Sequence, residues 1–289
     1  MRFCLLLGYC DPGHLVPIAR ECERSGWDAV AVPDSVFYPA EVSAKYPYSA
    51  DGSRFWGPET PFVDPWVAIS FMAAATTSLR FVSSVLKLPI RHPLLVAKTI
   101  ASVSAIAGDR FALGVGLSWI PEEFAWLGQD FATRAARTDE AIDVVRLVLS
   151  GDMVEHHGEH FDFGPLQVSP PPPARVPIYV GGVSLGAVRR AVRLGDGWIS
   201  VSRPLDELEA AVSGVRTRLE ELGRDPAVFR LLAVRTGRPD EEELERLNAM
   251  GISDVMVAPW WGAGSAPSLD DKLGAIQSYA DDVIRSGRG

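Results

Sequence analysis

The chain has 289 residues, is 47% hydrophobic and carries a formal net charge of −9 at pH 7, with a pI near 5.1. This acidic balance argues against nucleic acid or a membrane surface as the main partner. Three cysteines without CxxC spacing predict a reducing compartment and no disulfide framework. Because no apolar run approaches about 18 residues and no signal-peptide pattern opens the chain, we expect a soluble, cytoplasmic protein.

Eight short, continuously apolar segments recur along the chain, and each is typical of a strand buried on both faces of a parallel sheet. Helical patterns, most of which end at glycines, separate them. This alternation predicts an α/β fold in which residues 1–289 form a single (β/α)8 TIM-barrel domain, with a doubly wound open sheet as the alternative. The predicted strands are Phe3–Leu7, Ala29–Val32, Leu79–Val85, Phe111–Val115, Ile178–Val180, Trp198–Val201, Phe229–Val234 and Asp254–Val257. The predicted helices are His14–Ser25, Pro65–Thr77, one that begins near Pro93, Thr138–Leu149, Ser184–Leu194, Leu205–Glu221, Glu241–Met250 and Leu269–Arg285.

Two segments are longer than ordinary connections, and we expect both to be functional. The loop Ser35–Val63, after the second strand, is rich in aromatic residues. We expect it to act as a lid and as an apolar wall for the substrate. The segment Asp152–Val176, before the fifth strand, predicts a small hairpin (VEHHGEHFDF) followed by a proline-rich tether.

Small residues follow three of the predicted strands. Ser83 and Ser84 end the third strand, and Gly116 and Ser118 end the fourth. The carboxyl ends of barrel strands form the active-site face, and small residues there leave room for a large, flat ligand. After the fifth strand, the turn Gly181–Ser184 opens a helix, where converging backbone amides are suited to binding a phosphate.

Several single residues are further candidates. Lys87, just past the third strand, has three interpretations: a lysine in solvent, a Schiff-base nucleophile of a barrel lyase, or a partner for an acidic cofactor tail. Arg175 and Arg203 are candidates for binding an anion. Cys10 and His14 flank the first loop and are candidates for lining the substrate site.

The predicted hairpin holds an HHxxH cluster made of His156, His157 and His160, with two glutamates nearby. Side chains of these types bind metals in many proteins. Because the hairpin is predicted to be exposed, we expect no metal there.

Several segments, taken in order, carry a family resemblance over nearly the whole chain: SGWDAVAVPDS, GDRFALGVGLSW, EEFAWLG and VPIYVGGVSLGAVRRAVRLGDGW. Their order and spacing are similar to those of the luciferase-like family of (β/α)8 barrels, which use flavin or deazaflavin cofactors. Within that family the chain looks closest to the branch that uses coenzyme F420, an 8-hydroxy-5-deazaflavin. The branch that uses FMN as a reduced co-substrate is the alternative.

The resemblance implies where a cofactor binds. It implies a non-prolyl cis peptide in a bulge that backs the ring, between Ser84 and Val85, and it puts the turn after the fifth strand at the phosphate. The cofactor-binding residues implied in this way are Asp34, Ser83, Ser84, Val85, Gly116, Ser118, Gly181, Gly182, Val183 and Ser184.

The candidate catalytic residues are Asp34 and Ser35. In much of this branch the matching pair is Asp-His, with the histidine acting as acid or base, and here a serine follows Asp34. A serine hydroxyl is a poor base near neutral pH. We therefore expect a reductase rather than an alcohol dehydrogenase.

The resemblance implies an enzyme, an F420-dependent oxidoreductase that transfers a hydride between the ring and a small organic substrate. We expect a homodimer. Three alternatives stay open. They are an FMN-dependent monooxygenase supplied with reduced cofactor by a partner reductase, a lyase that uses Lys87, and a non-catalytic cofactor-binding protein.

Overall fold

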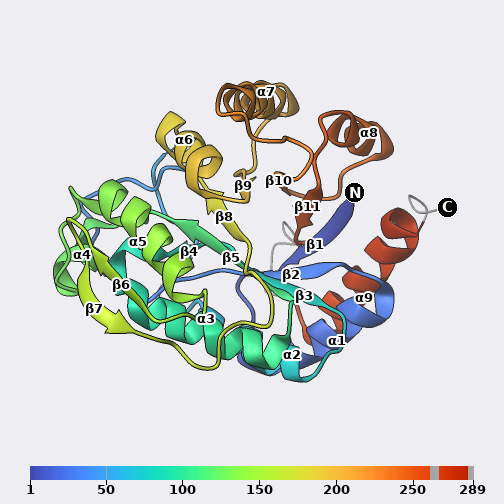
Figure 1. The fold of residues 1–289 in the computed structure, drawn as a ribbon. Coiled ribbons are helices and arrows are strands. Elements are labelled where there is room, and N and C mark those ends of the chain that lie inside the picture. The colour runs from blue at the N-terminus through green and yellow to red at the C-terminus, as the bar shows by residue number, and fades with distance from the viewer. Residues whose placement is uncertain (50, 261–266, 286–289) are drawn as a thin grey trace.

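The computed structural model describes residues 1–49, 51–260 and 267–285. In this part of the chain, eight parallel strand positions close into a barrel that is surrounded by helices (Figure 1). β1 pairs with both β2 and β11, and β3 and β4 both pair with β5 at a single barrel position. The barrel strands are β1 (Arg2–Leu6), β2 (Ala29–Val32), β3 (Arg80–Ser83), β4 (Leu86–Lys87), β5 (Phe111–Gly116), β8 (Ile178–Gly181), β9 (Gly197–Ile199), β10 (Arg230–Arg235) and β11 (Asp254–Val257).

The helices begin and end largely where the sequence predicts. Asp64 caps α2 through the backbone amide of Trp66, and Gly26 ends α1 in the left-handed conformation, with a φ of 86°. The helices are α1 (Leu15–Ser25), α2 (Pro65–Ala74), α3 (Pro93–Ala107), α4 (Pro121–Trp126), α5 (Arg134–Val148), α6 (Leu185–Leu194), α7 (Leu205–Glu221), α8 (Glu241–Ala249) and α9 (Leu269–Tyr279).

All eight predicted strands and the closed (β/α)8 barrel are confirmed, and the open sheet is wrong. Several boundaries differ, three of them among the helices that follow β5. α4 was not predicted, α5 begins four residues before the predicted Thr138, and the last helix continues beyond Tyr279 as a π-helical turn, Ala280–Ile284. None of the described helices is long and apolar enough to cross a membrane.

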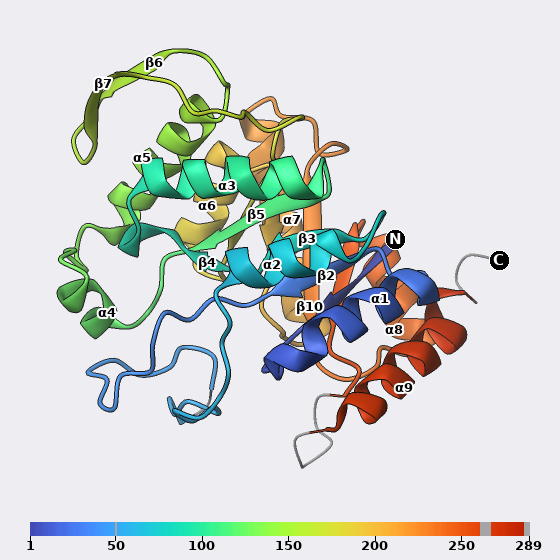
Figure 2. The same cartoon turned by 90° about the horizontal axis from the view of Figure 1, so that it is seen from below.

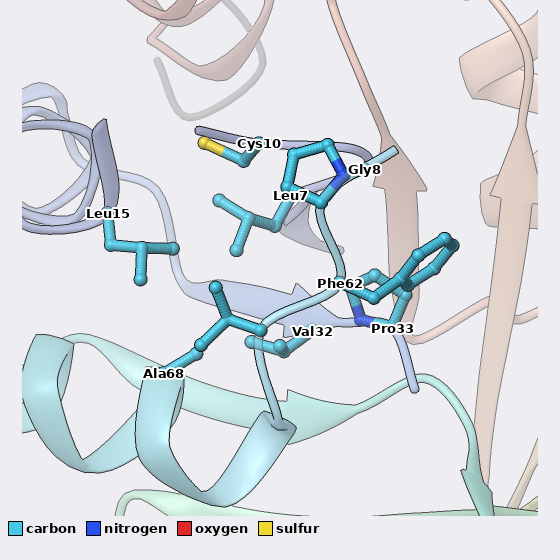
Figure 3. A pocket seen from close by; sticks show the side chains of 10 residues that line it. Leu7, Gly8, Cys10, Leu15, Val32, Pro33, Phe62 and Ala68 are labelled. Atoms are coloured by element: carbon cyan, nitrogen blue, oxygen red, sulfur yellow. The ribbon is translucent and has the colours of Figure 1, made fainter. Parts of the chain in front are cut away.

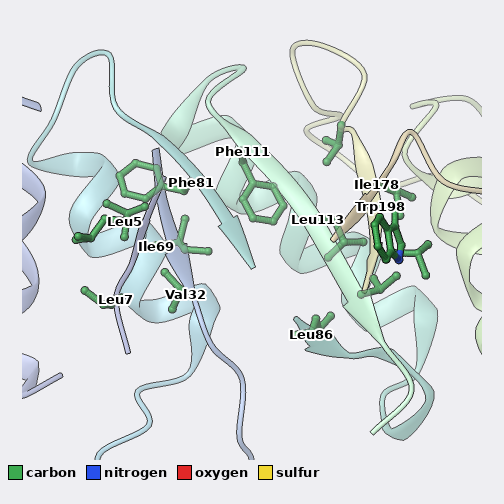
Figure 4. Close-up of a cluster of buried hydrophobic side chains, with 14 of the residues drawn as sticks. Leu5, Leu7, Val32, Ile69, Phe81, Leu86, Phe111, Leu113, Ile178 and Trp198 are labelled. Carbon is green, nitrogen blue, oxygen red and sulfur yellow. The ribbon is translucent and has the colours of Figure 1, made fainter. Parts of the chain in front are cut away.

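The core has two layers, because successive side chains of a strand point to opposite faces. Outward-facing residues such as Leu5, Phe81 and Leu113 pack against the helices (Figure 4). Inward-facing residues such as Cys4 and Met256 fill the barrel. A filled interior leaves the carboxyl ends of the strands as the place for a site.

Both predicted long segments are present. Between β2 and α2 the described chain forms neither helix nor strand, and it loops out beside α4 (Figure 2). The predicted hairpin is confirmed as β6 (Val154–His157) and β7 (Asp162–Leu166), which pair antiparallel. Glu140 of α5 holds this hairpin, since its carboxylate accepts hydrogen bonds from the backbone amides of His160 and Phe161 at 2.9 and 2.8 Å.

Candidate active site

The third barrel position is interrupted by a bulge at its carboxyl end. The peptide between Ser84 and Val85 is cis and non-prolyl, which confirms that expectation. The Ser83 hydroxyl lies 2.9 Å from both the amide and the carbonyl of Gly114. These contacts fix the start of the bulge against β5, while Ser84 and Val85 stay partly exposed.

Glycines on two neighbouring strands make room for this bulge. A Cβ at Gly116 would lie 2.6 Å from a Val85 methyl group, and one at Gly181 would lie 2.7 Å from the other. Real side chains do not approach this closely. The glycines predicted to lie beside a ligand therefore also admit Val85, which sits between β5 and β8 at the barrel mouth.

Asp34 is buried beneath the mouth, and its carboxylate is only 1% exposed. It accepts two hydrogen bonds from the Arg91 guanidinium, at 2.7 and 2.8 Å, and a third from the backbone amide of Lys87 at 2.8 Å. This differs from the expectation of a carboxylate that acts on a ligand. The Asp34 side chain is committed to holding β4 and Arg91 in place.

Ser35 opens the long loop and lies partly buried. Its hydroxyl is 3.5 Å from the Phe37 carbonyl, at the limit of a hydrogen bond. Among the described residues, the hydrogen-bond partner of this hydroxyl is a backbone carbonyl, and a neutral hydroxyl is a poor base near neutral pH.

Lys87 is buried, so its interpretation as a lysine in solvent is wrong. Its ammonium pairs with the carboxylate of Glu123, which is 0% exposed and belongs to α4. The second carboxylate oxygen of Glu123 accepts a hydrogen bond of 2.8 Å from the Ser118 hydroxyl. An ammonium held by a buried carboxylate is a poor nucleophile, and this geometry disfavours the Schiff-base lyase.

The aromatic loop folds back over the mouth. Tyr46 is its hub, with its ring 5.1 Å from Trp56 and 5.3 Å from Trp119, which follows β5. Tyr9, which follows β1, contacts Phe62 at 5.1 Å. Burial raises the pKa of Tyr46 to about 12 and that of Tyr9 further, so both hydroxyls stay protonated at neutral pH. The loop and Tyr9 therefore present an aromatic surface whose polar groups are uncharged tyrosine hydroxyls.

A small, mostly apolar cavity lies between β1, β2, α2 and the end of the loop (Figure 3). Cys10 lines it together with Leu7, Val32 and Phe62. Burial raises the pKa of the Cys10 thiol to about 11, so the thiol stays neutral at pH 7. His14 is not among the lining residues, and its Nδ1 lies 3.3 Å from the ammonium of Lys272.

The turn between β8 and α6 has the form expected of an anion site. Gly182 has a φ of 126°, a conformation that other residues rarely adopt. The Ser184 hydroxyl caps α6 by accepting from the amide of Ala187 at 3.1 Å. The first-turn amides of Leu185 and Gly186 have no acceptor within the helix. They lie on an exposed surface at the positive end of the helix dipole.

The two arginines suggested for anion binding have different positions. Arg175 precedes β8, at the amino end of the barrel, and pairs with Asp196 at 2.8 Å, so the structure does not bring it to the predicted turn. Arg203 follows β9 at the carboxyl end. Burial raises the pKa of Tyr48 in the loop, and the nearby charge of Arg203 opposes that rise. Arg203 therefore stays a candidate for binding an anion at the barrel mouth.

The histidine cluster does not converge on a single point. His156 contacts Glu140 at 3.1 Å, and His157 contacts Asp162 at 2.7 Å. Within the described ranges, no group of three histidine, cysteine, aspartate or glutamate side chains is arranged to hold a metal ion.

Comparison with known proteins gives the class to which this barrel belongs. The model of the luciferase-like monooxygenase family matches residues 7–280, so the chain belongs to that family and is an enzyme. The resemblance seen in the sequence is thereby confirmed.

Individual relatives vary in what is known of them. An uncharacterized protein of Mycobacterium tuberculosis is 37% identical over 287 residues, covering 98% of this chain and 99% of that protein. An F420-dependent glucose-6-phosphate dehydrogenase of Mycolicibacterium gilvum is 28% identical over 280 residues, covering 94% and 77%. A solved F420-dependent secondary alcohol dehydrogenase, in complex with an F420-acetone adduct, has a TM-score of 0.79 at 17% identity and covers 98% of each chain. This last likeness shows a shared fold.

Proposed function

We propose that the protein is an F420-dependent oxidoreductase that reduces a small, partly apolar organic substrate. The observation that carries the proposal is the Ser84–Val85 bulge at the mouth of a luciferase-like barrel, framed by glycines and facing an aromatic loop. The relationship to an F420-dependent dehydrogenase over 94% of the chain supports the choice of coenzyme.

The residues at the mouth fit a flat ring. Val85 presents its side chain between Gly116 and Gly181, so its surroundings are backbone and small groups. Across the mouth, Tyr9 and Tyr46 belong to a cluster of rings that contact one another edge to face. A planar ring system held between Val85 and such a wall would be shielded from water.

The α6 turn fits a phosphate group, which both coenzyme F420 and FMN carry. The amides of Leu185 and Gly186 and the helix dipole supply the positive potential, and Gly182 lets the backbone approach closely. Gly182 is itself fixed in place, because its amide donates to the Ile199 carbonyl and its carbonyl accepts from the Trp198 indole at 2.7 Å. These two hydrogen bonds hold the turn in a conformation that is suited to binding an anion.

When bound, the coenzyme would supply hydride chemistry at C5 of its ring. The chain's own residues would hold and orient it, exclude water and provide the proton that a reduction needs. The aromatic loop is fastened to α4, since the Ser43 amide donates to Glu122 at 2.8 Å and the rings of Phe37 and Trp126 lie 5.6 Å apart. A lid fastened in this way suits a substrate that is partly apolar.

Replacing Gly182 by valine should weaken F420 binding about tenfold or more. A β-branched residue does not adopt a φ of 126°, so the turn must rearrange, and the phosphate loses one or two charge-assisted hydrogen bonds of about 1.5–3 kcal/mol each. Fluorescence titration of the coenzyme measures the affinity.

Gly223→Val is the matched control for this variant. Gly223 also has a positive φ, 63°, with open space around it, and it ends α7 away from the mouth. We expect F420 affinity within about twofold of wild type for the control. Unchanged affinity of a folded Gly182→Val protein would place the phosphate elsewhere.

An FMN-dependent monooxygenase is the second candidate, and the family's own description favours it. The ring and phosphate features described above suit FMN as well. The two functions differ in whether molecular oxygen is consumed. A monooxygenase consumes oxygen together with reduced flavin that a reductase supplies. Oxygen uptake with reduced FMN, against anaerobic turnover with reduced F420, separates them.

A further inference from the structure

Ser118 adopts a conformation that favours glycine. Its φ is 61°, and it is the one non-glycine residue with a positive φ in the described ranges. A glycine would adopt this backbone without strain, whereas a serine at this φ is uncommon. The chain keeps a side chain here at an energetic cost, and such outliers cluster where a side chain has a function.

The Ser118 hydroxyl is the outer member of a buried network. It donates to Glu123, whose other carboxylate oxygen accepts from the Lys87 ammonium. Glu123 is fully buried and Lys87 nearly so, while Ser118 stays partly exposed. Of the three residues, Ser118 is thus the one open to a ligand. It lies two residues past Gly116, which packs against Val85 of the bulge.

A buried ion pair is a weak source of stability. Removing two charges from water costs several kcal/mol per ion, and well-packed apolar residues often replace such a pair without loss. The pair nevertheless occupies the junction of β4, β5 and α4, one barrel position from Ser35, whose hydroxyl contacts the Phe37 carbonyl. Asp34, the other buried carboxylate near Ser35 that the structure describes, is committed to Arg91.

We propose that Lys87, Glu123 and Ser118 form a proton relay that ends at the substrate, with Ser118 as the catalytic residue and the other two behind it. This inference rests on the proposed function. A hydride from the reduced deazaflavin forms a new C–H bond at an electrophilic carbon of the substrate, and the π electron pair moves onto the atom at its other end. Lys87 first gives a proton to Glu123, and the carboxyl group turns so that its protonated oxygen faces Ser118. The substrate atom then takes the proton of the Ser118 hydroxyl, and Ser118 takes the proton of Glu123, which is left as the carboxylate. Neutral Lys87 then regains a proton from water.

In the resting network, Ser118 and Lys87 both donate to the Glu123 carboxylate. The proton that the relay delivers is therefore the one that the Lys87 ammonium donates to Glu123. The same geometry explains how a chain with serine at position 35 still protonates its product.

The first test removes the hydroxyl without straining the backbone. Single-turnover oxidation of reduced F420 by 2-cyclohexen-1-one should be about 10²-fold slower in Ser118→Gly, as expected for the loss of a general acid. The rate is measured at saturating F420 for each variant, with the dissociation constant determined by fluorescence titration, so that a change in affinity does not enter the comparison. Ser150→Gly, two residues after α5, is the matched control and should react at the wild-type rate. A Ser118→Gly rate within about threefold of wild type would overturn the relay.

The second test needs no turnover. The chain has four lysines, Lys45, Lys87, Lys98 and Lys272, so ε-¹⁵N-lysine labelling gives a simple NMR spectrum. The Lys87 signal is assigned by its absence from Lys87→Met. It should shift when oxidised F420 is added, and the shift should fall by about half or more in Ser118→Gly. A structural ion pair that does not reach the site would leave the signal unmoved, which would overturn the proposal.

The two tests separate this relay from the proposed function. If F420 does not bind to the wild-type protein, the proposed function fails, and the Lys87 signal is then followed with FMN. A Ser118-dependent shift with FMN supports the relay with a different cofactor. A Lys87 signal that responds to neither cofactor overturns it.

Discussion

Replacing Lys87 by methionine should lower the free energy of unfolding by about 3–5 kcal/mol. The variant leaves the fully buried Glu123 carboxylate without its counter-ion, and breaking a buried pair from one side has this cost. Urea denaturation followed by circular dichroism measures the effect. Because Lys87 is a nearly buried part of an ion pair, this loss should be among the largest of any lysine substitution in the chain.

Two further variants make the measurement specific. The double variant Lys87→Met/Glu123→Leu removes both charges and should recover most of the loss. Lys98→Met changes an exposed lysine whose ammonium donates to the Ser169 carbonyl, and should cost about 1 kcal/mol or less. A Lys87→Met protein as stable as Lys98→Met would contradict a buried ion pair at the mouth.

The second large effect concerns the direction of the reaction. Wild-type protein with oxidised F420 should oxidise 2-propanol or glucose 6-phosphate about 10²–10⁴-fold more slowly than reduced F420 reduces a good enone or imine. The reason is that Ser35 supplies no general base, a contribution of that size. Steady-state assays in both directions, run with the same panel of substrates, measure the ratio. Brisk alcohol oxidation that is abolished by Ser35→Ala would contradict this reading of position 35.

Most of the fold could be predicted because it depends on local patterns. Strands buried on both faces appear as short apolar runs, and caps such as Asp64 and stops such as Gly26 mark the helix ends. α4 was missed because six residues are too few to show a helical period. Its position matters, since α4 carries both the carboxylate that fastens the loop and the one that pairs with Lys87.

The site could be predicted only in part, because its ion pairs join residues far apart in sequence. Lys87 and Glu123 are 36 positions apart, and Asp34 and Arg91 are 57 apart. No local pattern shows such a partner, so the sequence leaves three interpretations of Lys87 open, none of them a buried pair with Glu123, and predicts that Asp34 is free to act on a ligand. The cis peptide before Val85 was expected from the family resemblance alone, since no residue type encodes it. A signal was available for Glu123 in the segment EEFAWLG, whose second glutamate it is and which carries part of the family resemblance.

Coenzyme selectivity tests the central claim most directly. Fluorescence and calorimetric titration of the wild-type protein with F420 and with oxidised FMN, under one set of conditions, should give a dissociation constant for F420 that is at least about tenfold lower, equivalent to about 1.4 kcal/mol. Equal affinities, or tighter binding of FMN, would contradict the assignment to the deazaflavin branch of the family.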